Sequence, residues 1–153
     1  MNNRVRFKKM LIYFALLIVL GSLSSLSVEW LSGESVAQIY TDINLPPMSP
    51  PGWVFGPAWV FLYVVLSVYS ATLNVSSVLG KVNTIQLVLN IVWTPIFFGL
   101  GLTWLALIVV IAMDVLTVIL IVRDTQKIRL ILYVYLAWLI FATYLTFGVL
   151  ILN

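Results

Sequence analysis

The sequence predicts an all-α membrane protein, a bundle of five transmembrane helices. The chain has 153 residues, of which 63% are hydrophobic and only 8% are charged, and its mean hydropathy is +1.14. Soluble domains carry about 25% charged residues, so this chain has too few charges to cover the surface of a water-soluble globule. Its successive apolar segments have the length that membrane-spanning helices need, about 20 residues each.

These apolar segments divide into five spans within a single domain that covers residues 1–153. Residues 10–28 carry no charge and are longer than the apolar part of a usual signal peptide, so the first segment is interpreted as a retained span. The glycines of GLGLT, residues 99–103, separate the third helix from the fourth. The expected helices are residues 8–28, 50–74, 83–100, 103–122 and 129–151.

Prolines mark one helix start and one interruption. The stretch LPPMSPPGWVFGPAW, residues 45–59, stands where the second helix begins. Ser49 is expected to cap this helix, and Pro50 to occupy its first turn, where a missing N–H costs no hydrogen bond. Pro95 lies inside the third helix, so it should remove one hydrogen bond and free the carbonyl of Ile91.

The charges predict how the chain is oriented in the membrane. With five spans, every Lys and Arg falls on one face, and the first loop on the opposite face is acidic. The positive-inside rule therefore predicts a multi-pass protein of the cell membrane with a cytoplasmic N-terminus and an extracellular C-terminus. Topology explains the net charge of +3, so we expect the lipid bilayer and no nucleic acid as a partner. The basic residues are Arg4, Arg6, Lys8, Lys9, Lys81, Arg123, Lys127 and Arg129, and the acidic ones in the first loop are Glu29, Glu34 and Asp42.

Polar side chains inside the spans are candidate functional residues. Asp114 lies near the middle of the fourth helix, where an Asp costs roughly 2.5–3.5 kcal/mol. It is either a ligand contact or proton site, or a structural clasp to a neighbouring helix. Gln86, Asn90, Trp93 and Phe97 follow spacings of four, three and four residues and so share an inward-facing side of the third helix. This stripe either meets a ligand or joins helices.

Three tryptophans are expected deep in the membrane rather than at its surface. Trp59, Trp93 and Trp138 lie about 10 Å or more from the nearest helix end, and each indole N–H needs a partner. Convergence on one internal cavity would provide it, while ordinary aromatic packing is the alternative. Phe55 and Tyr63 share the face of Trp59, and Tyr135, Ala142 and Leu145 share that of Trp138.

A cavity of this kind suits a large, flat, hydrophobic ligand such as a porphyrin or a drug-like aromatic amide. The chain has no Cys and no His, so the usual zinc sites and the commonest haem ligands are excluded. The composition therefore favours a metal-free tetrapyrrole, or haem held without a strong protein ligand. No metal site and no required cofactor are expected.

Three stretches resemble the TspO/MBR family, the tryptophan-rich sensory proteins related to the mitochondrial translocator protein, or peripheral benzodiazepine receptor. They are SPPGWVFGPAWVFLYVVLSVY (49–69), QLVLNIVWTPIFFG (86–99) and YLAWLIFATYL (135–145). The resemblance implies a five-helix membrane fold whose cavity opens toward the first loop. It also implies binding of protoporphyrin IX or haem and of benzodiazepine-type ligands, and a homodimer.

The resemblance also assigns residues. It places the pocket tryptophans at Trp59 and Trp138, a polar contact at Asn90, and an aromatic cover at Tyr40. The chain departs from the family pattern at Met48, Val134 and Thr146. Together with the residues singled out above, the expected ligand-binding set is Tyr40, Pro51, Phe55, Trp59, Tyr63, Asn90, Trp93, Phe97, Asp114, Tyr135, Trp138 and Ala142.

Three functions are compatible with such a cavity. The first is a tetrapyrrole-binding membrane receptor with a sensory or regulatory role. The second is an enzyme that degrades protoporphyrin in light, in which Trp59 and Trp138 would be the catalytic residues. No acid–base pair or nucleotide loop is visible, so binding is favoured over turnover. The third is a porphyrin transporter, which the lack of an internal repeat disfavours. Gly21 and Ser25 form a small-xxx-small pair, a motif of helix contacts and a weak indication of a dimer interface.

Overall fold

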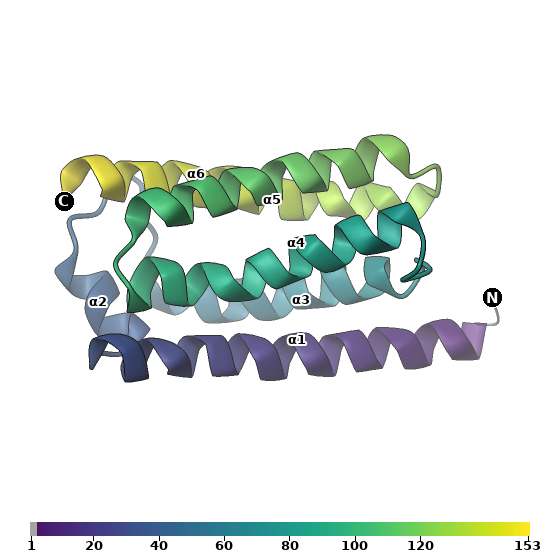
Figure 1. Ribbon diagram of the computed structural model, residues 1–153, viewed down its shortest axis with the longest axis horizontal. Helices are drawn as coiled ribbons and strands as arrows, with labels where there is room; N and C mark the ends of the chain where they lie inside the picture. The colour runs from purple at the N-terminus through teal and green to yellow at the C-terminus, as the bar shows by residue number, and fades with distance from the viewer. Residues whose placement is uncertain (1–2) are drawn as a thin grey trace.

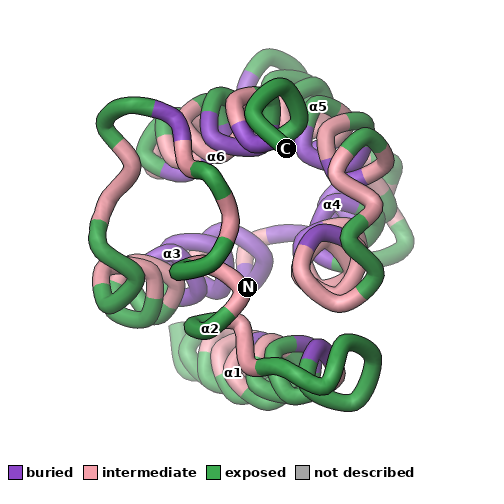
Figure 2. Tube along the Cα trace, turned by 90° about the vertical axis from the view of Figure 1, so that its left-hand side faces the viewer, coloured by how far each residue is buried: buried purple, intermediate pink, exposed green. Residues whose placement is uncertain are grey.

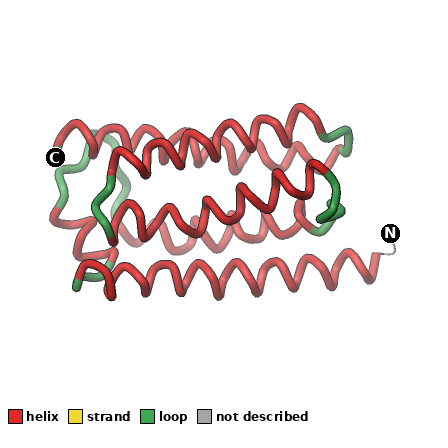
Figure 3. Tube along the Cα trace, in the orientation of Figure 1, coloured by secondary structure: helices red, strands yellow, loops and turns green. Residues whose placement is uncertain are grey.

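The computed structural model describes residues 3–153, and nearly all of this part of the chain is helical (Figure 1, Figure 3). No strand occurs within these residues, so the predicted all-α class is confirmed. The elements are α1 (Asn3–Ser32), α2 (Val36–Asp42), η1 (Gly52–Val54), α3 (Phe55–Ser70), α4 (Val78–Thr94), η2 (Pro95–Gly99), α5 (Thr103–Arg123), η3 (Lys127–Ile131) and α6 (Leu132–Leu152).

Five helices are long and apolar enough to cross a membrane, as the sequence predicts. Their bounds differ from the expected ones by up to five residues: the first span runs over Asn3–Ser32 rather than 8–28, and the third begins at Val78 rather than residue 83. The Ser77 hydroxyl accepts a hydrogen bond from the backbone N–H of Gly80 (3.0 Å), so the helix is capped there. Lys81 therefore lies in the first turns of α4, at the end of the span. The five spans are Asn3–Ser32, Gly52–Ser70, Val78–Gly99, Thr103–Arg123 and Lys127–Leu152.

The five spans form a ring, which Figure 2 shows end-on. α1 packs against α3 and α4, α5 lies between α4 and α6, and α3 and α6 complete the ring. The two termini lie at opposite ends of the bundle (Figure 1). The α3–α4 and α5–α6 connections lie at the end that holds the N-terminus, whereas α2 and the α4–α5 connection lie at the other end.

Along its length the bundle divides into two halves, and the half nearest the N-terminus is filled with side chains. We call it the closed half, formed by residues 62–70, 78–87, 110–121 and 132–139. Its helices also meet through polar pairs, because Asn83 Nδ2 donates to Ser70 Oγ (2.9 Å) and the Tyr69 hydroxyl donates to Asp124 Oδ2 (3.0 Å). We call the opposite half the hollow half, because it surrounds a cavity. The largest fully buried side chains of the closed half are Leu66, Tyr69, Gln86, Val110, Met113, Thr117, Leu120, Leu132, Tyr135 and Leu139.

The second helix begins two residues after the expected residue 50, and the predicted cap by Ser49 is wrong. The helix begins at Gly52 with the 3₁₀ turn η1, and no side chain caps it. The Ser49 hydroxyl instead donates to the carbonyl of Pro46 (2.7 Å), and Pro50 precedes the helix. A local turn that starts at Pro46 therefore competes successfully for the Ser49 side chain.

The predicted effect of Pro95 is confirmed and extended. The freed carbonyl of Ile91 accepts a hydrogen bond from Ser24 Oγ of α1 at 2.5 Å. After Pro95 the helix widens into the π-helical turn η2, in which the N–H of Leu100 bonds to the Pro95 carbonyl (2.9 Å). A π turn rotates the residues that follow it, so it changes which side chains face the bundle interior.

Gly21 allows α1 and α3 to approach closely. A Cβ atom at this position would collide with the side chain of Tyr63. Gly21 and Ser25 both line the cavity, so this small-residue pair faces the inside of the bundle. The weak indication of a dimer interface at this pair stays a prediction.

Candidate functional site

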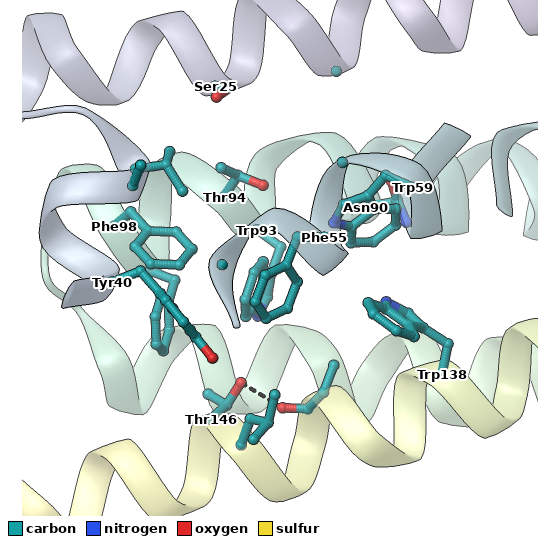
Figure 4. Close-up of a pocket in the computed structure, with 18 of the residues that line it drawn as sticks. Ser25, Tyr40, Phe55, Trp59, Asn90, Trp93, Thr94, Phe98, Trp138 and Thr146 are labelled. Carbon is teal, nitrogen blue, oxygen red and sulfur yellow. Dashed lines mark hydrogen bonds between the residues drawn. The ribbon is translucent and has the colours of Figure 1, made fainter. Parts of the chain in front are cut away.

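The hollow half encloses a cavity of about 520 Å³ (Figure 4). It lies between α1, α3, α4 with η2, and α6, and it is covered by α2 and the segment that leads to α3. None of its lining residues comes from α5. The lining residues expected from the sequence are Tyr40, Phe55, Trp59, Tyr63, Asn90, Trp93, Phe97, Trp138 and Ala142.

The three deep tryptophans all contribute to the lining of this cavity, as their depth in the spans led us to expect. Trp59 of α3 and Trp138 of α6 meet edge to face, with ring centroids 6.3 Å apart. Trp93 stacks on Phe97 at 4.9 Å, and its indole N–H donates to the carbonyl of Ala106 (3.1 Å). The indoles therefore form walls around a space that they do not fill.

A polar group lies where the cavity meets the closed half. Asn90 lines the cavity, and its side-chain N–H donates to the hydroxyl of Tyr135 (2.9 Å). Gln86 donates to the same hydroxyl. Within residues 3–153, the Asn90 Oδ1 atom is buried and has no hydrogen-bond partner. Tyr135 thus holds the Asn90 amide by its N–H, while the amide oxygen is buried without a partner at the border of the cavity.

A lid covers the opposite end of the cavity. We use this name for residues 33–51, which comprise α2 and the connection to η1. The Tyr40 hydroxyl donates to the Pro50 carbonyl (2.7 Å), and its ring packs edge to face on Phe55 at 5.1 Å. Burial raises the pKa of Tyr40 above its ordinary value, so the phenol stays neutral and can donate. Ser35 and Gln38 form a capping box that starts α2.

The lid is also fastened to the end of α6. The backbone N–H of Asn44 donates to Asn153 Oδ1 (2.9 Å), and Asn153 Nδ2 donates to the Asn44 carbonyl (3.0 Å). The Tyr144 hydroxyl donates to the Pro47 carbonyl (2.6 Å). Gly148 packs so closely that a Cβ there would lie 2.5 Å from the Pro46 Cβ. Hydrogen bonds and close packing therefore hold this end of the cavity shut.

Three expected site residues lie outside the cavity lining. Asp114 of α5 accepts a hydrogen bond from Thr143 Oγ1 of α6 (2.7 Å), which corresponds to the structural clasp rather than to a cavity contact. Tyr135 is fully buried beneath Asn90. Pro51 is exposed and precedes Gly52, which does line the cavity. Helical spacing alone could not show that Asp114 and Tyr135 face neighbouring helices.

The positions that depart from the family pattern have three different surroundings. Thr146 lines the cavity, and its hydroxyl donates a hydrogen bond to the Ala142 carbonyl (2.7 Å). Met48 is 85% exposed in the lid and adopts a positive φ of 65°, which non-glycine residues rarely do. Val134 faces away from the cavity, toward a groove between α3 and α6.

Several residues line the cavity that the sequence did not lead us to expect. Thr94 and Phe98 reach the cavity next to the π turn η2, and Phe98 packs against Phe97 at 4.6 Å. Ser22 lines the cavity from α1, as does Phe141 from α6. The small residues that α1 carries near its middle were a usable signal, since small side chains permit close contact or leave space.

Five spanning helices around an aromatic cavity, closed by a short lid, define a polytopic membrane protein with an intramembrane pocket. The TspO/MBR family model matches residues 13–152, and the chain belongs to this family. The Tryptophan-rich protein TspO of Archaeoglobus fulgidus is 34% identical over 133 residues, which cover 82% of this chain and 86% of that protein. The protein of the same name from Chlorobaculum tepidum is 33% identical over 124 residues, 74% of this chain and 78% of that one.

This chain is also similar to an animal protein. The human Translocator protein is 33% identical over 122 residues, which cover 72% of this chain and 72% of the human protein. The resemblance that the three sequence blocks indicate is thereby confirmed.

Proposed function

We propose that the protein is a membrane receptor that binds a tetrapyrrole, protoporphyrin IX or haem, in the cavity of the hollow half. The observation that carries the proposal is the placement of Trp59, Trp93 and Trp138 around one space of about 520 Å³. Ligand pockets of proteins commonly measure about 300–1,000 Å³ and are mostly apolar with a few polar groups. The aromatic walls suit a flat, conjugated ligand that stacks or makes edge contacts.

The polar groups of the cavity would orient such a ligand. The Oδ1 atom of Asn90 has no partner but is buried, so it could accept a hydrogen bond from an N–H or a protonated carboxyl group once the amide turned toward the cavity. A buried acceptor without a partner carries a desolvation cost of about 1–3 kcal/mol, which a ligand donor would relieve. Asn90 therefore favours ligands with a donor near the closed half.

The donor set of the cavity is better suited to a metal-free macrocycle than to tightly ligated haem. The chain has no His or Cys, and the lining residues with an oxygen that could approach iron include Tyr40 and Tyr63. The Tyr40 hydroxyl is already engaged by Pro50. Haem would thus be held by ring contacts rather than by a strong axial bond.

The proposal is tested by titrating purified protein in detergent with protoporphyrin IX and following the quenching of tryptophan fluorescence. The double variant Trp59→Phe/Trp138→Phe should bind about 5- to 150-fold more weakly, since two indole contacts of about 0.5–1.5 kcal/mol each are lost. The matched control is Trp30→Phe/Trp53→Phe, which removes two indoles that are 80% and 75% exposed. Equal affinity in the two double variants would contradict the assigned site.

Light-dependent degradation of protoporphyrin is a second candidate function. The pair of oxidisable indoles at Trp59 and Trp138, 6.3 Å apart at the cavity wall, favours it. Illumination of the complex should then destroy protoporphyrin faster than illumination of the free porphyrin, and the double variant should lose this excess. Bleaching at the rate of free porphyrin would exclude the activity.

We also propose that the protein lies in the cell membrane with its N-terminus in the cytoplasm. In support, Lys81 and Arg129 flank connections at the same end of the bundle as the N-terminus (Figure 1). The chain has no cysteine, so single cysteines introduced at Lys127 and at Asn153 can be labelled in intact cells with an impermeant maleimide. Labelling at Asn153 alone is expected, and labelling at Lys127 alone would reverse the orientation.

Finally, we propose a homodimer, which the family resemblance implies. Many large apolar side chains on the outer faces of α1 and α5 are exposed, and they are available to lipid or to a second copy. The mass of the protein in a lipid nanodisc, measured by native mass spectrometry, should be twice that of one chain. A single chain per nanodisc at excess protein would contradict the dimer.

A further inference from the structure

A second hollow lies on the outer side of the cavity wall. It is a groove of about 430 Å³ between α3 and α6, and every side chain that lines it is apolar. Both helices belong to membrane spans, and the exposed groove residues Phe61 (56%) and Val134 (48%) face outward. The groove therefore opens to the hydrocarbon interior of the bilayer. Its lining residues are Ala58, Phe61, Leu62, Val134, Ala137, Trp138 and Phe141.

The groove and the cavity share part of their walls. Trp138 and Phe141 line both spaces, and their ring centroids are 6.1 Å apart. Figure 4 shows the Trp138 side chain extending from α6 toward the cavity. Two aromatic side chains, which can change rotamer on a fast timescale where they are exposed, thus stand between the cavity and the membrane.

The two boundaries of the cavity differ in how they are held. Opening the lid would break the hydrogen bonds between Asn44 and Asn153, between Tyr144 and Pro47, and between Tyr40 and Pro50. Within residues 3–153, no hydrogen bond joins α3 to α6. Apolar contacts between helices can be exchanged for contacts with lipid tails, which are equally apolar. The α3–α6 boundary is therefore the easier one to open.

We propose that the groove between α3 and α6 is a lateral portal to the cavity. A lipid acyl chain occupies the groove at rest, and a hydrophobic ligand dissolved in the bilayer displaces it and passes Trp138 and Phe141 into the cavity. The portal rests on the proposed function, since it supplies the ligand of that same cavity. The lid then acts as a fixed cover, and the ligand does not cross the aqueous surface of the protein.

The variant Ala137→Phe tests the portal because Ala137 is exposed in the groove and does not line the cavity. An added ring there should obstruct passage without touching the bound ligand. Association and dissociation of protoporphyrin IX, measured by stopped-flow quenching in phosphatidylcholine nanodiscs, should both slow by about tenfold, with the dissociation constant unchanged. The matched control is Ala15→Phe, at an exposed alanine of α1, which should leave both rates unchanged. Equal rates in the two variants would overturn the portal.

A lid variant separates the two routes. Asn153→Ala removes the side chain that exchanges two hydrogen bonds with Asn44. If ligands crossed the lid, its loosening would accelerate association, whereas the lateral route predicts the parent rate. Faster association in Asn153→Ala would therefore overturn the portal.

Occupancy of the groove by an acyl chain has a readout that needs no porphyrin. Phospholipids with brominated chains quench nearby indoles, so nanodiscs made from them should quench Trp138 through the groove. Ala137→Phe should reduce this quenching and Ala15→Phe should not; equal quenching would overturn the acyl-chain occupant. If the parent protein showed no saturable protoporphyrin binding, the proposed function would fail. Quenching by the brominated lipids would still test whether an acyl chain occupies the groove.

Discussion

The closed half and the hollow half share α3, α4 and α6, yet only one of them is filled. In the closed half, Leu66, Met113 and Leu120 are at most 1% exposed and belong to one hydrophobic core cluster. In the hollow half, Trp59 and Trp138 stand at the walls and are only partly buried. The comparison teaches that large, rigid aromatic side chains, held at the wall of the bundle by their own helices, keep a space open. Flexible aliphatic side chains in the same places would close it.

The polar groups do not distinguish the two halves in this way. In both halves an amide N–H is paired across helices, as Asn83 is with Ser70 and Asn90 with Tyr135. The amide oxygens of Asn83 and Asn90 have no partner within the described residues. What sets Asn90 apart is its place in the cavity lining.

The largest expected effect is on the packing of the closed half. Leu66→Ala should lower the free energy of unfolding by about 2–3 kcal/mol, the low end for such a truncation, because lipid rather than water surrounds the protein. Unfolding by SDS in mixed micelles measures it, with Val64→Ala, at a 44% exposed position of the same helix, as control. Equal losses in the two variants would show that the closed half is not tightly packed.

A smaller effect is expected where the two halves meet. Tyr135→Phe removes the hydroxyl that accepts from both Gln86 and Asn90, and should cost about 1–2 kcal/mol of unfolding free energy. It should also weaken protoporphyrin binding, because the Asn90 amide is no longer held in one orientation. Full stability together with full affinity would mean that Tyr135 does not position Asn90.

The contact between α1 and the interrupted helix should contribute less. Ser24→Ala leaves the Ile91 carbonyl without its donor, and interhelical hydrogen bonds in membranes contribute on average about 0.6 kcal/mol. Ser27→Ala is the control, because the Ser27 hydroxyl bonds only within α1, to the Ser24 carbonyl. In thermal denaturation in detergent, Ser24→Ala should lower the midpoint temperature more than Ser27→Ala. The reverse order would contradict the role of Ser24.

The smallest expected effect is the pH dependence of the lid. Burial raises the pKa of Tyr40 above the ordinary value of 10.0, so the folded lid favours the neutral phenol. The resulting stability is fully present below pH 10 and is lost as the pH rises through the higher pKa of the folded lid. Protection of the lid from proteolysis should therefore fall above pH 10 in the parent, whereas Tyr40→Phe should show less of this dependence. If protection depended on pH identically in the parent and in Tyr40→Phe, Tyr40 would not be the source of the pH dependence.

Much of the fold could be predicted from the sequence, because membrane spans are set by local hydropathy and length. The inward stripe of the third helix and the depth of the tryptophans follow from helical spacing, so their convergence was foreseeable. The freed carbonyl of Ile91 follows from the chemistry of proline. Each of these is a property of one segment considered alone.

The remaining features depend on contacts between segments. Asp114 bonds to Thr143 of another helix, and Gly21 is required by the Tyr63 side chain opposite it. Ser49 turns back to Pro46 instead of capping the helix. The groove between α3 and α6 arises from how closely two helices pack, which no single segment encodes.

The most direct test of the account is an experimental structure of the protein with protoporphyrin IX bound. It should show the macrocycle inside the hollow half, in contact with Trp59 and Trp138 and with a donor directed at Asn90. A porphyrin bound to the outer surface of the helices, with aliphatic side chains filling the space between α1, α3 and α6, would contradict it.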